Sequence, residues 1–251
     1  NGQSSEYFSA TLGGSYALTP QNVRPAHQTE TFDASGTWVC PAGITAVLVE
    51  CWAAGGGGGK SGGGGGGGFS KKVLTLVPGT TYTVTVGVGG IGSAEGGGTA
   101  GGDSWFKDTA SILARGGKGG GTEPDDSIGT GGAVGIGKVT KAGGDGSQEG
   151  GGGAGAYLSA GTDAWKSYGA APEPGGGAGG THTVGEDPGG GGAAKCDGGN
   201  GRVVVTALVD PAHIVQQSYC AIPDWVPYCP QTYPFAFNEN SIDNNPLDAC
   251  T

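Results

Sequence analysis

The sequence predicts a mainly β protein, in which a small antiparallel β-sheet or sandwich is fused to a bundle of polyglycine II helices, with an extended N-terminal arm and a disulfide-tied C-terminal tail. Three observations lead to this fold class. Glycine makes up 60 of the 251 residues. Segments such as ITAVLVECW, YTVTVGV and RVVVTALV are rich in β-branched residues, as strands are. The cysteines form an even set of 6. We expect an arm at 1–30, a glycine-rich domain at 31–209 and a tail at 210–251.

The N-terminal arm, residues 1–30, is polar and punctuated by glycine and proline, which excludes a sustained helix. It has too few apolar side chains to pack as a domain. We therefore expect it to become ordered on a neighbouring subunit, by strand addition or by burial of its apolar side chains. Those side chains are Tyr7, Phe8, Tyr16 and Leu18.

The strands of the domain begin at Thr31. Two extended stretches flank a turn at Pro41–Gly43 and predict a strand pair. The segments KKVLTLV and TTYTVTVGV flank Pro78 and Gly79, where proline presets one turn dihedral and glycine supplies a positive φ, so we expect a hairpin there. The glycine tract closes at a last strand, Val203–Val209, which we expect to pair with the opening strands.

The glycine runs need a reason to be ordered, because fixing each backbone residue costs about 1–2 kcal/mol and glycine buries no side chain. In the polyglycine II conformation every NH and CO points sideways and can bond to a neighbouring rod, and only glycine allows the close approach. A bundle of such rods would be stiff without a side-chain core. Bulk within the run Gly62–Gly68, such as Gly65→Val, should then be severely destabilising.

The tail, residues 210–251, holds aromatic residues in a proline-rich stretch. Exposed aromatic rings stack on sugars or anchor protein partners. The alternative, which we favour, is that they are buried, against the tail itself, the glycine bundle or another subunit. These candidate interface residues are Tyr219, Trp225, Tyr228, Tyr233, Phe235 and Phe237.

The cysteines are expected to be oxidised, since a protein with little core gains stability from covalently closed loops. Cys220 and Cys229 are the nearest candidates for a pair, and the remaining connectivity stays open. The alternative is a set of reduced, buried thiols. The sequence begins at Asn1 and contains no methionine, which predicts a processed, exported protein on a cell surface, on a virion surface or in the extracellular space. The full set is Cys40, Cys51, Cys196, Cys220, Cys229 and Cys250.

Charge and motif content argue against several classes of function. A net charge of −10 without a basic cluster disfavours nucleic acid, and no apolar stretch reaches the length of a membrane span. The segment AAGGGGGKS fits a relaxed P-loop pattern. However, Ser61 is followed by the run Gly62–Gly68, which cannot start the helix that a P-loop requires. Nucleotide binding is therefore not expected.

Catalytic and metal sites lack the necessary residues. His27, His182 and His213 are scattered singly, and no G-x-S-x-G motif occurs, so we expect no enzyme, no cofactor and no metal. The acidic clusters at 123–126 and 186–187 could hold calcium, but neither has the ligand spacing of a known loop, and solvated turns are the favoured interpretation.

Four sequence segments follow one another along the chain in an order that resembles a known family. They are TFDASGTWVCPAGITAVLVECWAAGGGGG, GGFSKKVLTLVPGTTYTVTVGVGG, GGGTAGGDSWFKDTASILARGGKGGG and GGNGRVVVTALV. Together they resemble the glycine-rich domain of phage tail-fibre and tail-associated proteins and of bacterial surface proteins, over about residues 31–209. The chain is similar in kind to the polyglycine II adhesin tips of some tail fibres. The resemblance implies that the glycine region is a scaffold, that recognition lies in loops at its end, and that no catalytic residue carries over.

The expected function is therefore that of a non-enzymatic extracellular structural or adhesive protein. Our first hypothesis is the self-assembling subunit of a surface fibre or appendage, a homo-oligomer or filament joined through its terminal arms. The alternative is a receptor-binding adhesin of a phage tail fibre, with a cell-surface receptor or glycan as partner. The expected processing and cysteines favour the first hypothesis, because phage proteins assemble in a reducing cytoplasm.

Overall fold

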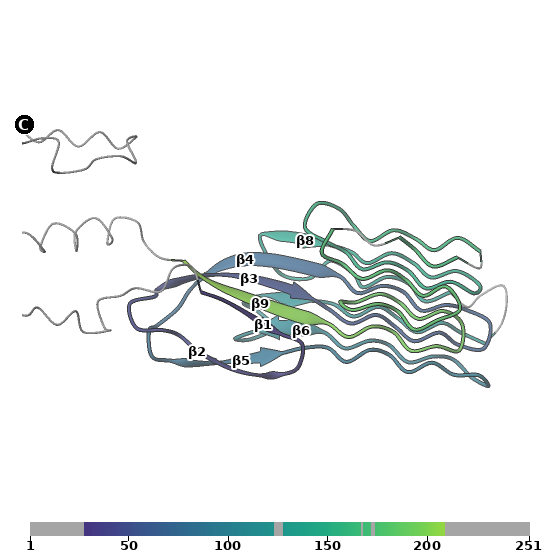
Figure 1. The fold of residues 1–251 in the computed structure, drawn as a ribbon, viewed down its shortest axis with the longest axis horizontal. Coiled ribbons are helices and arrows are strands. Elements are labelled where there is room, and N and C mark those ends of the chain that lie inside the picture. Colours follow the sequence, from purple (N-terminus) through teal and green to yellow (C-terminus); the bar gives the residue numbers. More distant parts are fainter. Residues whose placement is uncertain (1–27, 123–127, 167, 172–173, 209–251) are drawn as a thin grey trace, which may run out of the picture. The chain divides into compact units, whose positions relative to one another are not determined.

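The computed structural model describes residues 28–122, 128–166, 168–171 and 174–208, all within a compact unit that ends at Leu208. These residues form two antiparallel β-sheets joined to a large block of glycine-rich chain (Figure 1). No helix occurs among them, and hence none that could cross a membrane.

The larger sheet, sheet A, has five strands in the order β1-β9-β3-β4-β8. Its central strand β3 pairs along its whole length with both neighbours, and these three strands are the longest of the domain. The strands are β1 (Thr29–Phe32), β9 (Arg202–Leu208), β3 (Ala46–Trp52), β4 (Phe69–Thr75) and β8 (Val139–Lys141).

The smaller sheet, sheet B, has four strands in the order β2-β5-β6-β7. The strands are β2 (Gly36–Val39), β5 (Thr81–Thr85), β6 (Ser104–Phe106) and β7 (Leu113–Ala114).

The side-chain core lies where the two sheets meet. Along β3 and β9 buried residues alternate with partly exposed ones, as expected for strands with one covered face. Val49 and Val205 point into the core, and β3 and β9 both contact β6 of the other sheet. Within sheet B, Trp38 of β2 meets Phe106 of β6 edge to face, with ring centroids 5.9 Å apart.

The turn residues were identified correctly, but the strand pairing around them was wrong. Gly43 and Gly79 have φ values of 78° and 75°, as turns of this kind require. Each turn carries the chain from one sheet to the other, so that β2 does not pair with β3 and β4 does not pair with β5. A turn signal reports a local reversal and contains no information about which strand becomes the partner.

The closing strand behaves as the sequence predicts. Strand β9 pairs with β1 and with β3 and fastens the two ends of the glycine-rich tract into one domain. Strand β1 includes Thr29 and Glu30, which the sequence analysis assigned to the N-terminal arm. The rest of that arm and the predicted tail lie outside the described residues.

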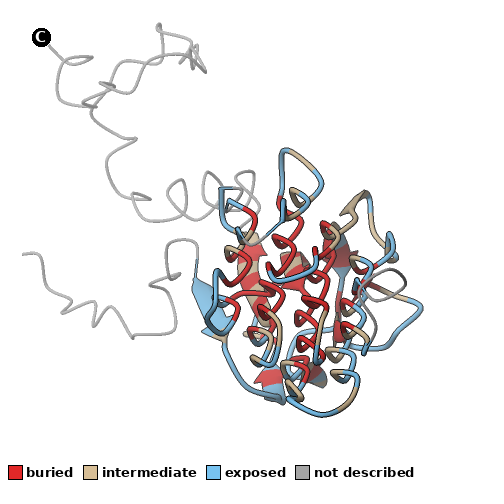
Figure 2. Ribbon diagram, turned by 90° about the vertical axis from the view of Figure 1, so that its right-hand side faces the viewer, coloured by how far each residue is buried: buried red, intermediate tan, exposed pale blue. Residues whose placement is uncertain are grey.

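The glycine block consists of the described residues within 53–68, 87–103, 115–137 and 142–201. Its runs leave the sheets as extended chain, turn, and come back (Figure 1). Backbone hydrogen bonds join runs that are distant in sequence. Gly64 N donates to Gly192 O at 2.9 Å, and Gly191 N donates to Gly152 O at 2.8 Å. Runs in the middle of the block are buried and are surrounded by exposed chain (Figure 2).

The predicted polyglycine II helix bundle was wrong. The described residues are all-β with two antiparallel sheets and contain no helix. The glycine runs are connections between strands, and their NH and CO groups bond to other runs. The sheets are therefore the regular structure that organises the domain.

The predicted disulfides were also wrong wherever the structure describes the cysteines, because Cys40, Cys51 and Cys196 are free. Cys40 donates its thiol hydrogen to Ile44 O at 3.2 Å, which places it before the start of β3, whereas Cys51 lies near the end of that strand. The chain from Ile44 to Cys51 spans about 20 Å at roughly 3.3 Å per residue. A disulfide requires Cα atoms within about 7 Å of each other. Cys220, Cys229 and Cys250 lie outside the described residues.

Candidate binding surface

The two ends of the domain differ: the glycine block extends from one end of sheet A, and the first and last described residues lie at the other end. Trp52 pairs with both Phe69 and Arg202, so the runs leave β3, β4 and β9 at the same end of sheet A. Thr29 pairs with Thr206, so the described chain begins and finishes at the opposite end. We call the end of the block away from the sheets the far end; it faces the viewer in Figure 2, and its turns are mostly exposed.

A groove of about 570 Å³ opens at the far end, and we call it the far-end groove. It combines two ammonium groups, a carboxylate, an imidazole, a carboxamide, a hydroxyl and a thiol. His182 Nε2 lies 3.7 Å from Glu149 Oε2, and both side chains are largely exposed. The lining residues are Lys60, Ser61, Gln148, Glu149, His182, Ala194, Lys195 and Cys196.

The turns that form this groove are tied to one another through the backbone. Lys195 N donates to Gly59 O at 2.9 Å, and Ala194 N donates to Glu149 O at 3.0 Å. The turn at Lys60 is tied to a further run, since Lys60 N donates to Gly96 O at 2.9 Å. Segments from four distant parts of the sequence therefore hold the groove in one geometry.

A tight hairpin with two exposed aromatic rings adjoins the groove. Trp165 N donates to Tyr168 O at 3.2 Å, and Tyr168 N donates back to Trp165 O at 3.0 Å. The two side chains are 68% and 65% exposed. Lys166 O accepts from the backbone of Glu149 and Gly150, both at 3.3 Å, which fixes the hairpin to the groove wall. We call Trp165, Lys166 and Tyr168 the aromatic hairpin.

Three residues of this surface have a left-handed backbone. Lys166, His182 and Lys195 have φ values of 53°, 55° and 69°. A non-glycine residue in this region costs roughly 1–2 kcal/mol relative to an ordinary conformation. A fourth such residue, Lys107 with a φ of 69°, lies beside the sheets, so this backbone conformation is not confined to the far-end surface.

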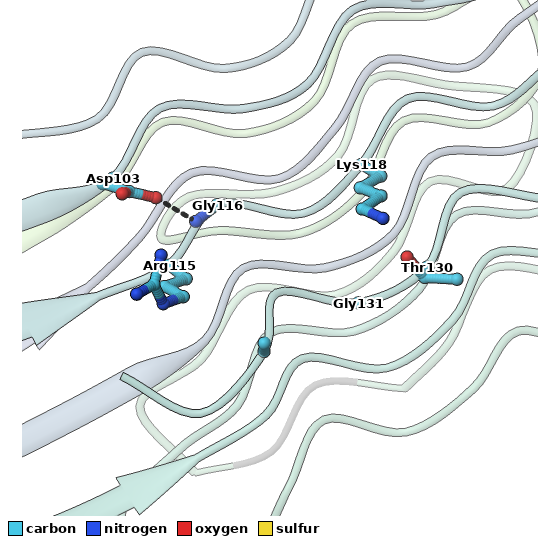
Figure 3. A pocket seen from close by; sticks show the side chains of 7 residues that line it. Asp103, Arg115, Gly116, Lys118, Thr130 and Gly131 are labelled. Atoms are coloured by element: carbon cyan, nitrogen blue, oxygen red, sulfur yellow. Dashed lines mark hydrogen bonds between the residues drawn. The ribbon is translucent and has the colours of Figure 1, made fainter. Parts of the chain in front are cut away.

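A second depression lies on the side of the block. It measures about 410 Å³ and is lined in part by Asp103, Arg115, Lys118 and Thr130. Asp103 Oδ1 accepts a hydrogen bond from Gly116 N at 2.9 Å (Figure 3). Arg115 and Lys118 come from one run and Thr130 from the next (Figure 3). The two cations could attract an anion, but the depression has no aromatic ring among its lining residues.

The interface residues that the sequence analysis proposed all lie outside the described residues, so the structure brings none of them to this surface. Those residues are Tyr7, Phe8, Tyr16, Leu18, Tyr219, Trp225, Tyr228, Tyr233, Phe235 and Phe237.

The family resemblance implied recognition in loops at the end of the glycine region, but none of the far-end residues was among the proposed interface residues. The one usable sequence signal was a pair of large aromatic residues, Trp165 and Tyr168, in a segment dominated by small ones. The lysine and serine of the P-loop-like segment, Lys60 and Ser61, lie at the groove, in a turn between two glycine runs.

Metal-binding chemistry finds no support at the described positions. Within the described part of the chain, no three His, Cys, Asp or Glu residues are grouped so that they could hold an ion. In the acidic pair Glu186–Asp187, Asp187 accepts a hydrogen bond from the backbone of Asn200, which lies 13 residues further along the chain. The cluster at 123–126 lies outside the described residues.

Comparison with known proteins places the chain in a family. No curated protein matches the sequence. The model of a family described as "Glycine-rich domain" matches residues 28–208, a range that holds both sheets and the whole glycine block. This match covers more than half of the chain, and the protein therefore belongs to the glycine-rich domain family.

Proposed function

We propose that this protein is a non-enzymatic adhesin of an extracellular particle or cell surface. In this proposal the glycine block is a rigid support, and the far-end groove with the aromatic hairpin is the receptor-binding surface. The observation that carries the proposal is the backbone bonding between buried glycine runs, which holds exposed, chemically varied turns at one end of the domain.

Rigidity follows from how closely the runs approach. A Cβ built on Gly64 would lie 2.1 Å from Gly56 O, and one built on Gly191 would lie 2.2 Å from Gly64 O. Neighbouring runs are thus in backbone contact, without side chains that could change rotamer. A binding surface on such a support loses little conformational entropy when it takes up a partner.

The free thiols bear on the choice between our two hypotheses, a self-assembling fibre subunit and a tail-fibre adhesin. Proteins that rely on disulfides belong to oxidising compartments, whereas Cys40, Cys51 and Cys196 are unpaired. This state suits a protein that folds and assembles in a reducing cytoplasm before it is displayed. It favours a receptor-binding adhesin on a phage tail fibre over a secreted, disulfide-stabilised fibre subunit.

The adhesin proposal is tested by cell binding. Fluorescently labelled full-length protein is incubated with intact bacteria of several species, and attachment is measured by flow cytometry. The double variant Lys60→Glu with Lys195→Glu reverses two charges in the groove and should lower attachment about tenfold. The matched control, Lys107→Glu with Lys138→Glu, changes exposed lysines beside the sheets and should attach normally. No attachment by the unaltered protein to any species would refute the adhesin.

Assembly through the terminal arms remains our second candidate. It is favoured by the position of Thr29 and Leu208 at the end of sheet A away from the far-end groove, which leaves that groove clear when subunits join there. The test is a deletion of residues 1–27. The deletion should stop there because Thr29 begins β1 and Ala207 N donates to Gln28 O at 2.9 Å. A folded variant that no longer assembles in electron micrographs supports this candidate, whereas unchanged particles remove it.

A further inference from the structure

We propose that the far-end surface binds a saccharide, with the aromatic hairpin stacking against a sugar ring and the far-end groove hydrogen-bonding its hydroxyl groups. This inference rests on the proposed adhesive function and names the chemical class of its ligand.

The aromatic hairpin offers what a sugar ring requires. Aromatic side chains are amphipathic plates whose faces accept the CH groups of an apolar surface. Trp165 and Tyr168 leave about two thirds of their surface in water, although the same chain buries Trp38 and Phe106. Lys166 Nζ lies over the Trp165 ring, 4.7 Å from its centroid, so the ammonium covers one face of the indole and a sugar would stack on the other. The reciprocal backbone bonds join Trp165 to Tyr168, so both rings come from one hydrogen-bonded pair of residues.

The groove supplies the polar half of the recognition. Sugar hydroxyls both donate and accept hydrogen bonds, so a site for them needs both kinds of partner. Glu149 accepts, Lys60 and Lys195 donate, and Ser61 does both. The volume of about 570 Å³ lies within the range of about 300–1,000 Å³ typical of small-ligand sites. Opposite charges occur side by side here, which favours a neutral or weakly anionic sugar.

A protein partner fits these observations less well. Stable protein interfaces cover about 800 Å² on each side and have an apolar centre. Polar or charged groups occur on seven of the eight residues that line the groove, and the large apolar side chains beside it are two aromatic rings. The net charge of −10 argues equally against a nucleic acid.

The decisive experiment measures retention of full-length protein on an immobilised panel of oligosaccharides ending in glucose, galactose, N-acetylglucosamine or sialic acid. The unaltered protein should be retained on at least one class. Trp165→Ala and Tyr168→Ala should each weaken retention about tenfold or more, while Trp165→Phe keeps part of it. Tyr157→Ala is the matched control, because Tyr157 is 49% exposed and lies under Lys71 Nζ at 4.2 Å, beside the sheets. Retention on no class, or equal loss with Tyr157→Ala, would overturn the inference.

Periodate oxidation of the target cells separates this inference from the adhesin proposal. Periodate cleaves vicinal diols of surface glycans, and the inference expects it to abolish attachment of the labelled protein. Attachment that survives periodate but is lost after protease treatment identifies a protein receptor; the saccharide inference then fails and the adhesin stands. If the labelled protein attaches to untreated cells of no species, the result counts against both the adhesin proposal and the saccharide inference.

Discussion

The carbonyl oxygen of Thr130 lies where a side chain on Gly65 would begin: a Cβ built on Gly65 would be 2.1 Å from that oxygen. Real Cβ atoms do not approach this closely, and the opposing atom belongs to the backbone of another run. Any larger residue at position 65 would therefore force the two backbone runs apart.

Gly65→Ala should destabilise the domain, and Gly65→Val should do so more strongly. The new Cβ must push the Thr130 run outward and break lateral bonds, including the one that Lys118 N donates to Thr130 O at 2.9 Å. Overpacking of this kind costs about 1–3 kcal/mol or more. Urea unfolding measures the change. The control is Gly36→Ala, where nothing lies within 4 Å of the added Cβ. Equal stability of both alanine variants would show that the runs do not need their close contact.

Ser104→Ala should destabilise the junction between sheet B and the glycine block. Gly87 N donates to the buried Ser104 Oγ at 2.9 Å, and the variant leaves this amide without its partner. A buried unpaired amide costs about 1–3 kcal/mol.

The matched control for this prediction is Ser70→Ala. Ser70 is equally buried, but it donates to Leu113 O, which also accepts from Ile136 N at 2.8 Å and so keeps a partner. The loss of unfolding free energy should therefore be larger for Ser104→Ala than for Ser70→Ala. The reverse order would contradict this account of the junction.

Cys51 should make the domain sensitive to alkali. Complete burial raises the pKa of the Cys51 thiol far above its ordinary range, and the neighbouring Glu50 carboxylate raises it further. Because the folded pKa is raised, the stability from the neutral thiol is fully present below the pKa of the unfolded chain. It is lost as pH rises from that value through the folded pKa.

The measurement compares the unfolding free energies of the unaltered protein and of Cys51→Val between about pH 7 and pH 10.5. The unaltered protein should lose more stability, since valine cannot ionise while all other groups titrate in both proteins. Alkylation of the native protein at neutral pH should modify the partly exposed Cys196 and spare Cys51 and Cys40. Parallel stability curves would mean that Cys51 is not held as a neutral thiol.

Lys195→Gly should separate stability from binding. Glycine relieves the backbone strain at φ 69°, so the melting temperature should stay the same or rise, by an amount equivalent to about 1 kcal/mol. Removal of an ammonium group from the far-end groove should at the same time weaken attachment to cells. Differential scanning fluorimetry and the attachment assay give the two values. A clear fall in melting temperature would show that the side chain stabilises the turn.

Some features of the domain could be derived from the sequence because they depend on neighbouring residues. The alternating segment at β3 and the valine-rich segment at β9 become strands, and Gly79 adopts the positive φ of its turn. The four glycine and strand segments were also sufficient to indicate the family. The strands and the turn are encoded in side-chain type and order over fewer than about ten residues, whereas the family is indicated by the order of longer segments along the domain.

Only the tertiary structure decided which segments became neighbours. It placed β2 and β3 in different sheets, left Cys40 and Cys51 apart, and brought Glu149 and Lys195 to one groove. The physical reason lies in glycine itself. A run without side chains has no pattern to select its partner, so the register between runs is set by backbone hydrogen bonds and by the strands that anchor each end. The non-glycine residues at the turns are carried to wherever that register places them.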